Sequence, residues 1–174
     1  RVLFRSFKKA FARILKEFEV TEMNMMSKDA LSDVEEINDI RYVKASSSGP
    51  VLLTGGTGFF GPFILRVLIE QTDRDIFVLV RAENEGAAMV RLREALEVIV
   101  PSDDLKEMFE ARVKVVCGDI SKPKLGLTEA VWNNLSENIS TIYNNGALVN
   151  YLMDYESMRN ANVSGTIEVI RLAC

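Results

Sequence analysis

The stretch Val51-Leu-Leu-Thr-Gly-Gly-Thr-Gly-Phe-Phe-Gly-Pro62 decides the fold of this chain. Its first residues, 51–53, are branched and apolar, which suits one buried strand, and residues 63–70 continue with helical periodicity. Apolar residues that recur at i, i+4, i+7 and i+8 predict the buried face of that helix: Phe60, Ile64, Val67 and Leu68. A strand, a glycine turn and a helix in this order are the context that a dinucleotide-binding fingerprint requires.

Three glycines of this stretch follow one another at three-residue spacing, and each has a physical reason. Gly55 lets the chain leave the strand in a tight turn. Gly58 lets backbone N–H groups approach a pyrophosphate, and Gly61 lets the helix pack close to the strand. The helix N-terminus adds N–H donors and a partial positive charge, and Pro62 suits its first turn. A glycine-rich turn in an ordinary α/β protein is the alternative, but the flanking strand and helix favour cofactor binding. The Gly-x-x-Gly-x-x-Gly spacing is typical of short-chain dehydrogenases and reductases.

The composition excludes several other classes of function. At 174 residues and 48% hydrophobic, the chain is the size of one globular domain with a sizeable core. A net charge of −4 argues against a nucleic-acid surface. The sequence has no histidine, and Cys117 and Cys174 match no zinc spacing, so we expect no metal site and no disulfide. We expect Cys117 to be a small buried side chain. No apolar run is long enough to span a membrane, and no secretory signal is evident, so we expect a cytoplasmic protein.

The N-terminal third divides into two parts. Residues 1–6 are also a translation of a common sequencing-library adapter, so we interpret them as a non-native leader. Residues 7–49 are interpreted as a helical entry segment and linker, with an amphipathic helix at 7–20 and a short helix at 32–40. The first helix is expected to pack on its own or a neighbouring domain; contact with a membrane or partner is the alternative. Because the chain starts with Arg1 and stops inside a helical pattern at Cys174, we expect it to be a fragment.

Residues 50–174 alternate between strand and helix patterns. Besides the first strand and helix, we expect strands at 75–80, 113–117 and 140–143, and helices at 87–100, 102–110, from 128, at 154–160 and from 162. This alternation predicts an α/β fold, a doubly wound parallel sheet of the Rossmann type with right-handed crossovers. Ligands of such sheets bind at the carboxyl ends of the strands, so the residues that follow each strand are the candidate site.

Three of these segments carry candidate cofactor contacts. Arg81 ends the second strand, where an NAD site prefers an acid, and its guanidinium suits the 2′-phosphate of NADP. Arg91 and Arg93 open the next helix in our interpretation and are close enough to supply a second cation. The alternative is that all three arginines are solvated surface charges. Asp119 follows the third strand, on the adenine side, and also suits a capping role. Small residues after the fourth strand let the backbone approach the nicotinamide-side ribose: Asn145, Gly146 and Ala147.

Five stretches together resemble the thioester reductase domains that end carboxylic acid reductases, aminoadipate reductases and some nonribosomal peptide or polyketide synthases. They are residues 51–61, Leu79-Val-Arg-Ala82, Val116-Cys-Gly-Asp-Ile-Ser-Lys-Pro-Lys-Leu-Gly-Leu127, Ile142-Tyr-Asn-Asn-Gly-Ala-Leu-Val-Asn150 and Ala161-Asn-Val-Ser-Gly-Thr166. Fatty acyl-CoA reductases are close relatives of these domains. The resemblance implies the N-terminal portion of an extended short-chain dehydrogenase/reductase, NADPH as cofactor, and reductive release of an acyl thioester from a phosphopantetheine carrier domain.

Carried over by position, the resemblance implies cofactor contacts at Gly55, Thr57, Gly58, Phe59, Phe60, Gly61, Arg81, Arg91, Asp119, Asn145, Gly146 and Ala147. Asn144 stands where the family pattern has His, and residues 1–49 match nothing in it. The resemblance also implies that the catalytic Tyr-x-x-x-Lys pair and the substrate domain lie beyond Cys174, so no catalytic residue is expected within this chain. Tyr155 and Arg159 form a Tyr-x-x-x-Arg that comes one strand too early, and we interpret it as structural.

Besides a fatty acyl-CoA reductase, two other functions fit the same pattern. A sugar-nucleotide epimerase or dehydratase of the same superfamily is one, although such enzymes usually have an acid near Arg81. A non-catalytic NADP-binding regulator, from a different class, is the other. A multidomain thioester reductase remains the leading hypothesis for the whole protein.

Overall fold

The computed structural model describes residues 21–30, 48–97, 99 and 103–174. Its strands are β1 (Val51–Thr54), β2 (Ile76–Val80), β3 (Val113–Cys117) and β4 (Thr141–Asn144), all parallel, in the order β3-β2-β1-β4. The helices are α2 (Gly61–Gln71), α3 (Glu85–Glu97), α4 (Asp103–Arg112), α5 (Glu129–Asn138), α6 (Tyr155–Arg159) and α7 (Gly165–Leu172). A 3₁₀ turn (Pro123–Gly126) follows β3, and a π-helical turn (Asn160–Ser164) joins α6 to α7.

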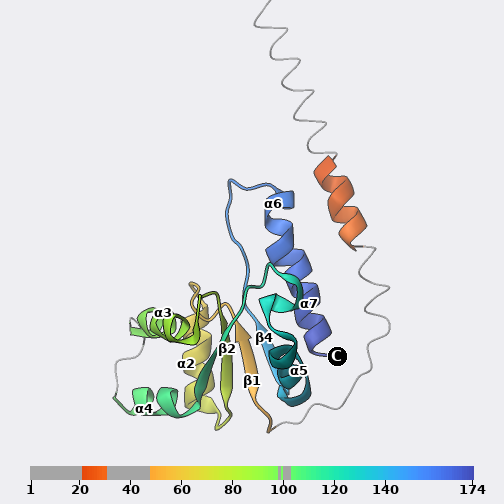
Figure 1. Ribbon diagram of the computed structural model, residues 1–174. Coiled ribbons are helices and arrows are strands. Elements are labelled where there is room, and N and C mark those ends of the chain that lie inside the picture. The colour runs from red at the N-terminus through yellow and green to blue at the C-terminus, as the bar shows by residue number, and fades with distance from the viewer. Residues whose placement is uncertain (1–20, 31–47, 98, 100–102) are drawn as a thin grey trace, which may run out of the picture.

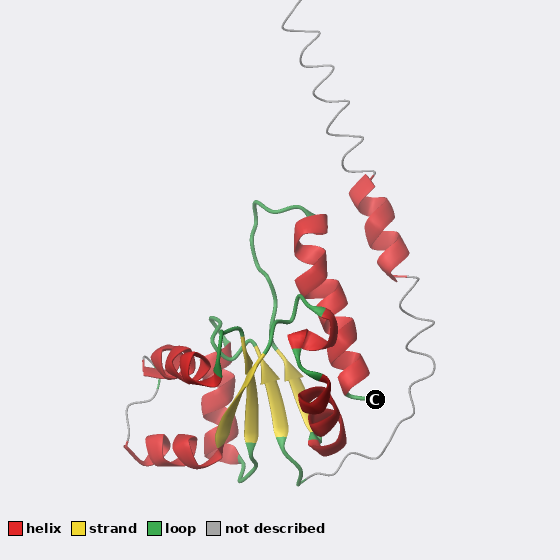
Figure 2. Ribbon diagram, in the orientation of Figure 1, coloured by secondary structure: helices red, strands yellow, loops and turns green. Residues whose placement is uncertain are grey.

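The sheet is covered on both faces, as Figure 1 and Figure 2 show. Alternate residues of β1 point to opposite layers: Val51 and Leu53 pack with α2, α3 and α4, whereas Leu52 packs with α5 and α7. Strand β2 alternates in the same way, with Val78 on the first face and Leu79 on the second. Burial on both faces explains the continuous apolar runs of these strands, and the predicted doubly wound parallel sheet is confirmed.

The order of the strands places the candidate site. From β1 the chain moves to β2 and β3 on one side, and it then returns to β4 on the other side of β1. This reversal is a topological switch point, and it lies between the carboxyl ends of β1 and β4. We call the ends of the four strands at Thr54, Val80, Cys117 and Asn144 the carboxyl edge, and the opposite end of the sheet the amino edge.

Arginine side chains close the amino edge. Arg74 donates from Nε to the carbonyl of Gly49 at 2.5 Å and from Nη2 to Thr141 Oγ1 at 3.0 Å, with Ser140 Oγ as a further acceptor. Arg112 donates from Nη2 to the carbonyl of Ile69 at 2.5 Å and thereby satisfies the C-terminal end of α2. These contacts join the start of β1, the start of β4 and two helices.

The expected buried face of α2 was partly wrong: Leu68 is buried and Ile64 is half-buried as expected, but Phe60 and Val67 are not. Phe60 is 59% exposed and Val67 is 46% exposed, whereas Leu65 and Ile69 are fully buried. Periodicity alone does not fix which side of a helix faces the sheet. The rotation is set at the start of α2, where a Cβ on Gly61 would lie 2.0 Å from the carbonyl oxygen of Gly55.

Several element bounds also differ from expectation. Helix α3 begins at Glu85 and ends at Glu97, and the last two helices form one helical run through the π-helical turn. Cys117 is half-buried rather than fully buried, and burial raises the pKa of the Cys117 thiol. Cys117 and Cys174 are both free cysteines. Residues 21–30 are helical, which the sequence pattern did not predict. The helices expected at 7–20 and 32–40 lie outside the described residues.

In the described part of the chain, no helix has both the length and the apolar character needed to cross a membrane.

Candidate cofactor site

The glycine turn after β1 is shaped by the close approach of the loop after β4. Gly55 has a φ of 66°, a conformation that favours glycine. A Cβ at Gly55 would lie 2.8 Å from the backbone of Asn145 and from the Cα of Gly146. The glycine at position 55 therefore serves two purposes, because it permits the turn and it leaves room for the neighbouring loop.

The first turn of α2 is open to an anion. Phe60 is the N-cap residue, and no side chain among the described residues caps the helix or places an acid in its first turn. Such an end leaves N–H donors and the positive end of the helix dipole unmatched. A Cβ on Gly58 would meet only the carbonyl oxygen of Gly55, at 3.2 Å, so the outer side of the turn is also open.

Hydrogen bonds tie the two loops of the switch point together. Thr54 is fully buried, and its hydroxyl donates to Asn144 Oδ1 at 2.7 Å and accepts from the N–H of Gly146 at 2.8 Å. Asn145 Nδ2 donates to the carbonyl of Gly55 at 3.2 Å. The asparagine that departs from the family pattern, Asn144, thus pairs with the hydroxyl that ends β1. The register agrees, because Thr54 and Asn144 are direct partners in the sheet.

Arg81, Arg91 and Asp119 come together at the ends of β2 and β3. Arg91 Nη1 donates to the carbonyl of Arg81, and both arginines are exposed. Asp119 Oδ1 accepts from Ser121 N at 3.0 Å and from Ser121 Oγ at 2.7 Å, so the capping role expected for this carboxylate is confirmed. Partial burial acts to raise the pKa of Asp119, but the hydrogen bonds from Ser121 and the positive charges of Arg81 and Lys122 outweigh it and lower the pKa.

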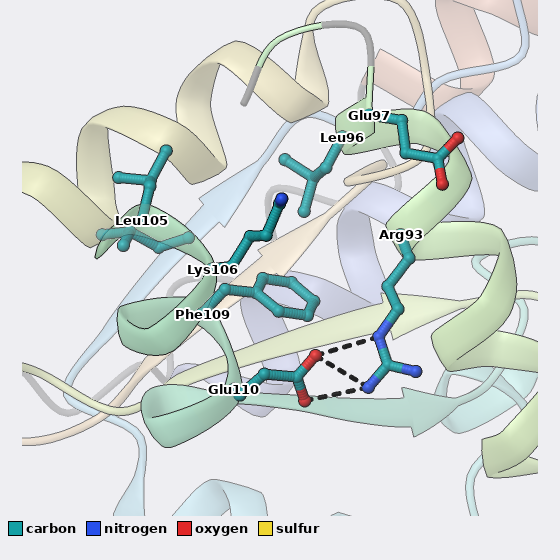
Figure 3. A pocket seen from close by; sticks show the side chains of 8 residues that line it. Arg93, Leu96, Glu97, Leu105, Lys106, Phe109 and Glu110 are labelled. Atoms are coloured by element: carbon teal, nitrogen blue, oxygen red, sulfur yellow. Dashed lines mark hydrogen bonds and ion pairs between the residues drawn. The ribbon is translucent and has the colours of Figure 1, made fainter. Parts of the chain in front are cut away.

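Arg93 does not join this group, which corrects the expectation that it supplies a second cation. Arg91 and Arg93 lie well inside α3, and Arg93 donates from Nη2 to Glu110 Oε2 of α4 at 2.8 Å. Figure 3 shows this pair among the residues that line a pocket, whose volume is about 380 Å³. The pocket lies between the ends of α2, α3 and α4, and its apolar lining includes Leu96, Leu105 and Phe109. It is therefore separate from the glycine turn.

Asn162 is a site-positioning residue that the sequence pattern did not assign. Its Nδ2 donates to the carbonyl of Leu148 at 2.9 Å, and its Oδ1 accepts from the N–H of Leu148 at 2.7 Å. The Asn162 side chain thus bonds both the N–H and the carbonyl of Leu148, the residue after Ala147. Asn162 lies in the π-helical turn, a feature that is frequent at functional sites. The signal was present in the stretch 161–166, but only the fold shows what the amide contacts.

The residues at the carboxyl edge fit a nicotinamide dinucleotide. The uncapped start of α2 suits a pyrophosphate, the exposed arginines after β2 suit an additional phosphate, and the loop after β4 brings backbone groups to the switch point. Phe59 and Phe60 are 95% and 59% exposed, so we expect their backbone rather than their rings to take part. Thr57 is half-buried in the same turn. Among the described residues, no group of His, Cys, Asp and Glu side chains could hold a metal ion.

The fold and this edge define a Rossmann-type nucleotide-binding domain. The model of the male sterility protein family, an NAD-binding family, matches residues 53–174. The chain belongs to this family, whose members include thioester reductase domains.

Three known proteins illustrate the relationship. The chain is 44% identical to a linear gramicidin synthase protein of Brevibacillus parabrevis over 70% of its own length, which is 2% of that protein. It is 37% identical to the L-2-aminoadipate reductase large subunit of Penicillium chrysogenum over 84% of its length, which is 11% of that protein. The terminal R domain from the myxalamid PKS-NRPS pathway matches with a TM-score of 0.68 and 46% identity, over 74% of this chain and 32% of that one. The chain thus spans a small part of the relatives it matches.

Proposed function

We propose that this chain is the cofactor-binding part of an NADPH-dependent thioester reductase that releases a carrier-bound acyl chain as aldehyde or alcohol. The observation that carries the proposal is the joining of the open glycine turn to the loop after β4 through Thr54 and Asn145. The relatives support the activity, because they include an aminoadipate reductase and the terminal R domain of a PKS-NRPS pathway.

The choice of NADPH rests on Arg81. This residue follows β2 at the carboxyl edge, and Arg91 fixes its backbone by donating to its carbonyl. An arginine offers a planar fork of donors to a phosphate, whereas a ribose hydroxyl is better bound by a carboxylate. Asp119, the nearby acid, has its Oδ1 engaged by Ser121.

Each loop has a separate task in this proposal. The start of α2 and the turn at Gly58 bind the pyrophosphate, Arg81 and Arg91 hold the 2′-phosphate, and Asp119 lies at the adenine end. Asn145, Gly146 and Ala147 bind the nicotinamide-side ribose. The cofactor, when bound, supplies a hydride to the acyl carbonyl carbon. No catalytic residue is assigned within this chain.

The domain organisation belongs to the same proposal. Residues 50–174 are the NADP-binding domain, residues 7–49 lead into it, and residues 1–6 are a non-native leader. The proposed partner is an acyl thioester on a phosphopantetheine carrier. We further propose that the whole protein is multidomain, which the length of two relatives supports, since the chain covers 2% and 11% of them. We place the protein in the cytoplasm.

Cofactor titration of the Arg81→Ala variant tests the proposal. We expect NADPH affinity to fall by about 1.5–3 kcal/mol, the range for a hydrogen bond to a charged group, and NADH affinity to change little. Fluorescence titration of both cofactors measures the two changes. Arg93→Ala is the matched control, because Arg93 pairs with Glu110 away from the edge and its loss should leave both affinities unchanged. Equal losses for both cofactors in Arg81→Ala would reject the phosphate role.

A further inference from the structure

The helical segment at residues 21–30 lies against α6, although residues 31–50 separate it in sequence from the first strand of the sheet. Figure 1 shows this segment, in orange, alongside α6. The residues that are less exposed share one helical face: Glu22, Met25 and Asp29. Met23 and Met26 are 66% and 50% exposed. One face of the segment is therefore packed and the other faces solvent.

Asp29 makes the principal contact between the segment and α6. Its carboxylate accepts from Arg159 Nε at 2.6 Å, from Arg159 Nη2 at 2.5 Å and from the Tyr155 hydroxyl at 2.6 Å. Asp29 is only 8% exposed, and these donors satisfy a carboxylate that would otherwise be costly to bury. The hydrogen bonds from Arg159, followed by that from Tyr155, hold the pKa of Asp29 below its ordinary value against the effect of burial. The Tyr-x-x-x-Arg spacing on α6 therefore has a structural use.

Glu22 makes a second contact, which fixes the direction of the segment. Its Oε1 accepts from the N–H of Tyr155, the first residue of α6, at 2.9 Å. Since Asp29 contacts Arg159 at the other end of α6, the segment and α6 run in the same direction. Helix α6 begins at the end of the loop that leaves β4 at the carboxyl edge. The start of the segment, at residue 21, therefore lies toward that edge.

We propose that residues 21–30 are a docking arm that α6 holds through Asp29, and that the arm keeps its own start, at residue 21, on the carboxyl side of the sheet. Ordering such a segment costs conformational entropy, and its packed face contains one apolar side chain of modest burial, Met25. The two carboxylates of the arm, those of Glu22 and Asp29, accept the hydrogen bonds from α6 described above, so we expect loss of the Asp29 charge to loosen the arm.

The arm has a consequence that rests on the proposed function. A thioester must reach the carboxyl edge to be reduced, and the arm holds residue 21 on that side of the sheet. An acyl carrier that precedes the arm would then be presented at a higher effective concentration than one on an unrestrained linker.

Pulsed dipolar spectroscopy tests the arm without any cofactor, so its outcome is independent of the proposed function. Spin labels are placed on Met23→Cys and Val149→Cys, two exposed positions outside the Asp29 contacts, in a Cys117→Ala and Cys174→Ala background of the whole chain. We expect one narrow distance distribution in this background. Asp29→Asn should broaden it at least twofold, because the amide cannot form the ion pair with Arg159. Glu156→Gln, an exposed carboxylate on α6, is the matched control and should leave the distribution narrow.

Hydrogen exchange separates release of the arm from general unfolding. In Asp29→Asn, amide exchange of residues 21–30 should rise at least tenfold while β1 and β2 keep their protection. Tyr155→Phe removes one donor and should give a smaller rise in the same segment. A broad distance distribution in the parent protein, or an unchanged distribution and unchanged arm exchange in Asp29→Asn, would overturn the proposal.

Discussion

The two edges of the sheet treat their polar groups in opposite ways. At the amino edge, Arg74 and Arg112 satisfy backbone carbonyls and side-chain hydroxyls with charged donors. At the carboxyl edge, α2 starts without a side-chain cap, and aromatic side chains such as Phe59 stand in solvent. The amino edge is thus closed by the protein itself, whereas the carboxyl edge leaves donors for a ligand.

This difference indicates that the amino edge contributes to the stability of the domain and the carboxyl edge to ligand binding. Buried backbone groups normally find partners, so an uncapped helix start at a topological switch point is a place where a ligand completes the hydrogen bonding. The two edges should therefore respond differently to substitution. Changes at the amino edge should lower the free energy of unfolding alone, and changes at the carboxyl edge should lower cofactor affinity.

The largest expected effect on stability comes from Gly61→Ala. This substitution should lower both the free energy of unfolding and the cofactor affinity, so it does not separate the two edges. Its Cβ would lie 2.0 Å from the Gly55 carbonyl oxygen and 2.7 Å from the Gly56 Cα, which are backbone atoms that cannot move aside cheaply. We expect a loss of about 3 kcal/mol in the free energy of unfolding, at the upper end for overpacking, and loss of NADPH binding. Urea denaturation and fluorescence titration measure the two. A variant with parental stability would show that α2 is free to shift.

The next largest effect is expected at the amino edge, where a substitution should change stability and not cofactor affinity. Arg74→Met removes charged donors from Gly49, Ser140 and Thr141 and should cost about 2 kcal/mol of unfolding free energy. Cofactor affinity of the folded protein should not change. Arg93→Met is the control, because its exposed pair with Glu110 is worth at most about 1 kcal/mol. Urea midpoints of the two variants give the comparison, and a lower NADPH affinity in Arg74→Met would contradict the separation of the edges.

Gly58→Val tests the carboxyl edge, where a substitution should change cofactor affinity and leave stability nearly unchanged. The Cβ at this position would meet only one atom, at 3.2 Å, so we expect the unfolding free energy to fall by less than about 1 kcal/mol. NADPH binding should nevertheless be abolished, because the side chain fills the space that a pyrophosphate needs beside the turn. Titration of a variant with cooperative urea unfolding is the measurement. Parental affinity in such a variant would remove Gly58 from the site.

The smallest expected effect is a pH dependence at Asp119. Its pKa is lowered in the folded protein, since the Ser121 hydrogen bonds and Arg81 outweigh partial burial. The carboxylate therefore stabilises the fold above its ordinary pKa near 4, and this contribution is lost as the pH falls through the lowered value. Because the group is partly exposed, Asp119→Asn should cost less than about 1 kcal/mol at pH 7, and the cost should be smaller at pH 3, below the ordinary pKa. Urea unfolding at both pH values measures it; an equal cost at both would assign the effect to shape rather than charge.

Much of the fold was predictable because local signals were strong. The run Val113–Cys117 coincides with β3, and Thr128 and Asp154 cap α5 and α6 through Val131 and Ser157. Strand runs, capping residues and glycine turns act over a few residues, so their physics is contained in the sequence. The segments that form the carboxyl edge could be identified for the same reason, because every strand of a parallel sheet ends on the same side.

The contacts within the site were less predictable. Arg91 and Arg93 look equivalent in the sequence, yet one donates to Arg81 and the other to Glu110. They lie two residues apart on a helix, a spacing that places them on different faces, and the neighbour of each face comes from another element. The roles of Asn162 and Asp29 depend in the same way on residues 14 and 126–130 positions distant.

The sequence by itself determined the order of strands and helices, the glycine turn and the lack of histidine chemistry. These follow from residue type and from spacing along one element. The tertiary structure alone decided which face of α2 is buried, that Thr54 joins the two loops of the switch point, and that Asp29 holds residues 21–30 on α6. Such outcomes depend on which distant surfaces meet, and close packing allows only one arrangement of them.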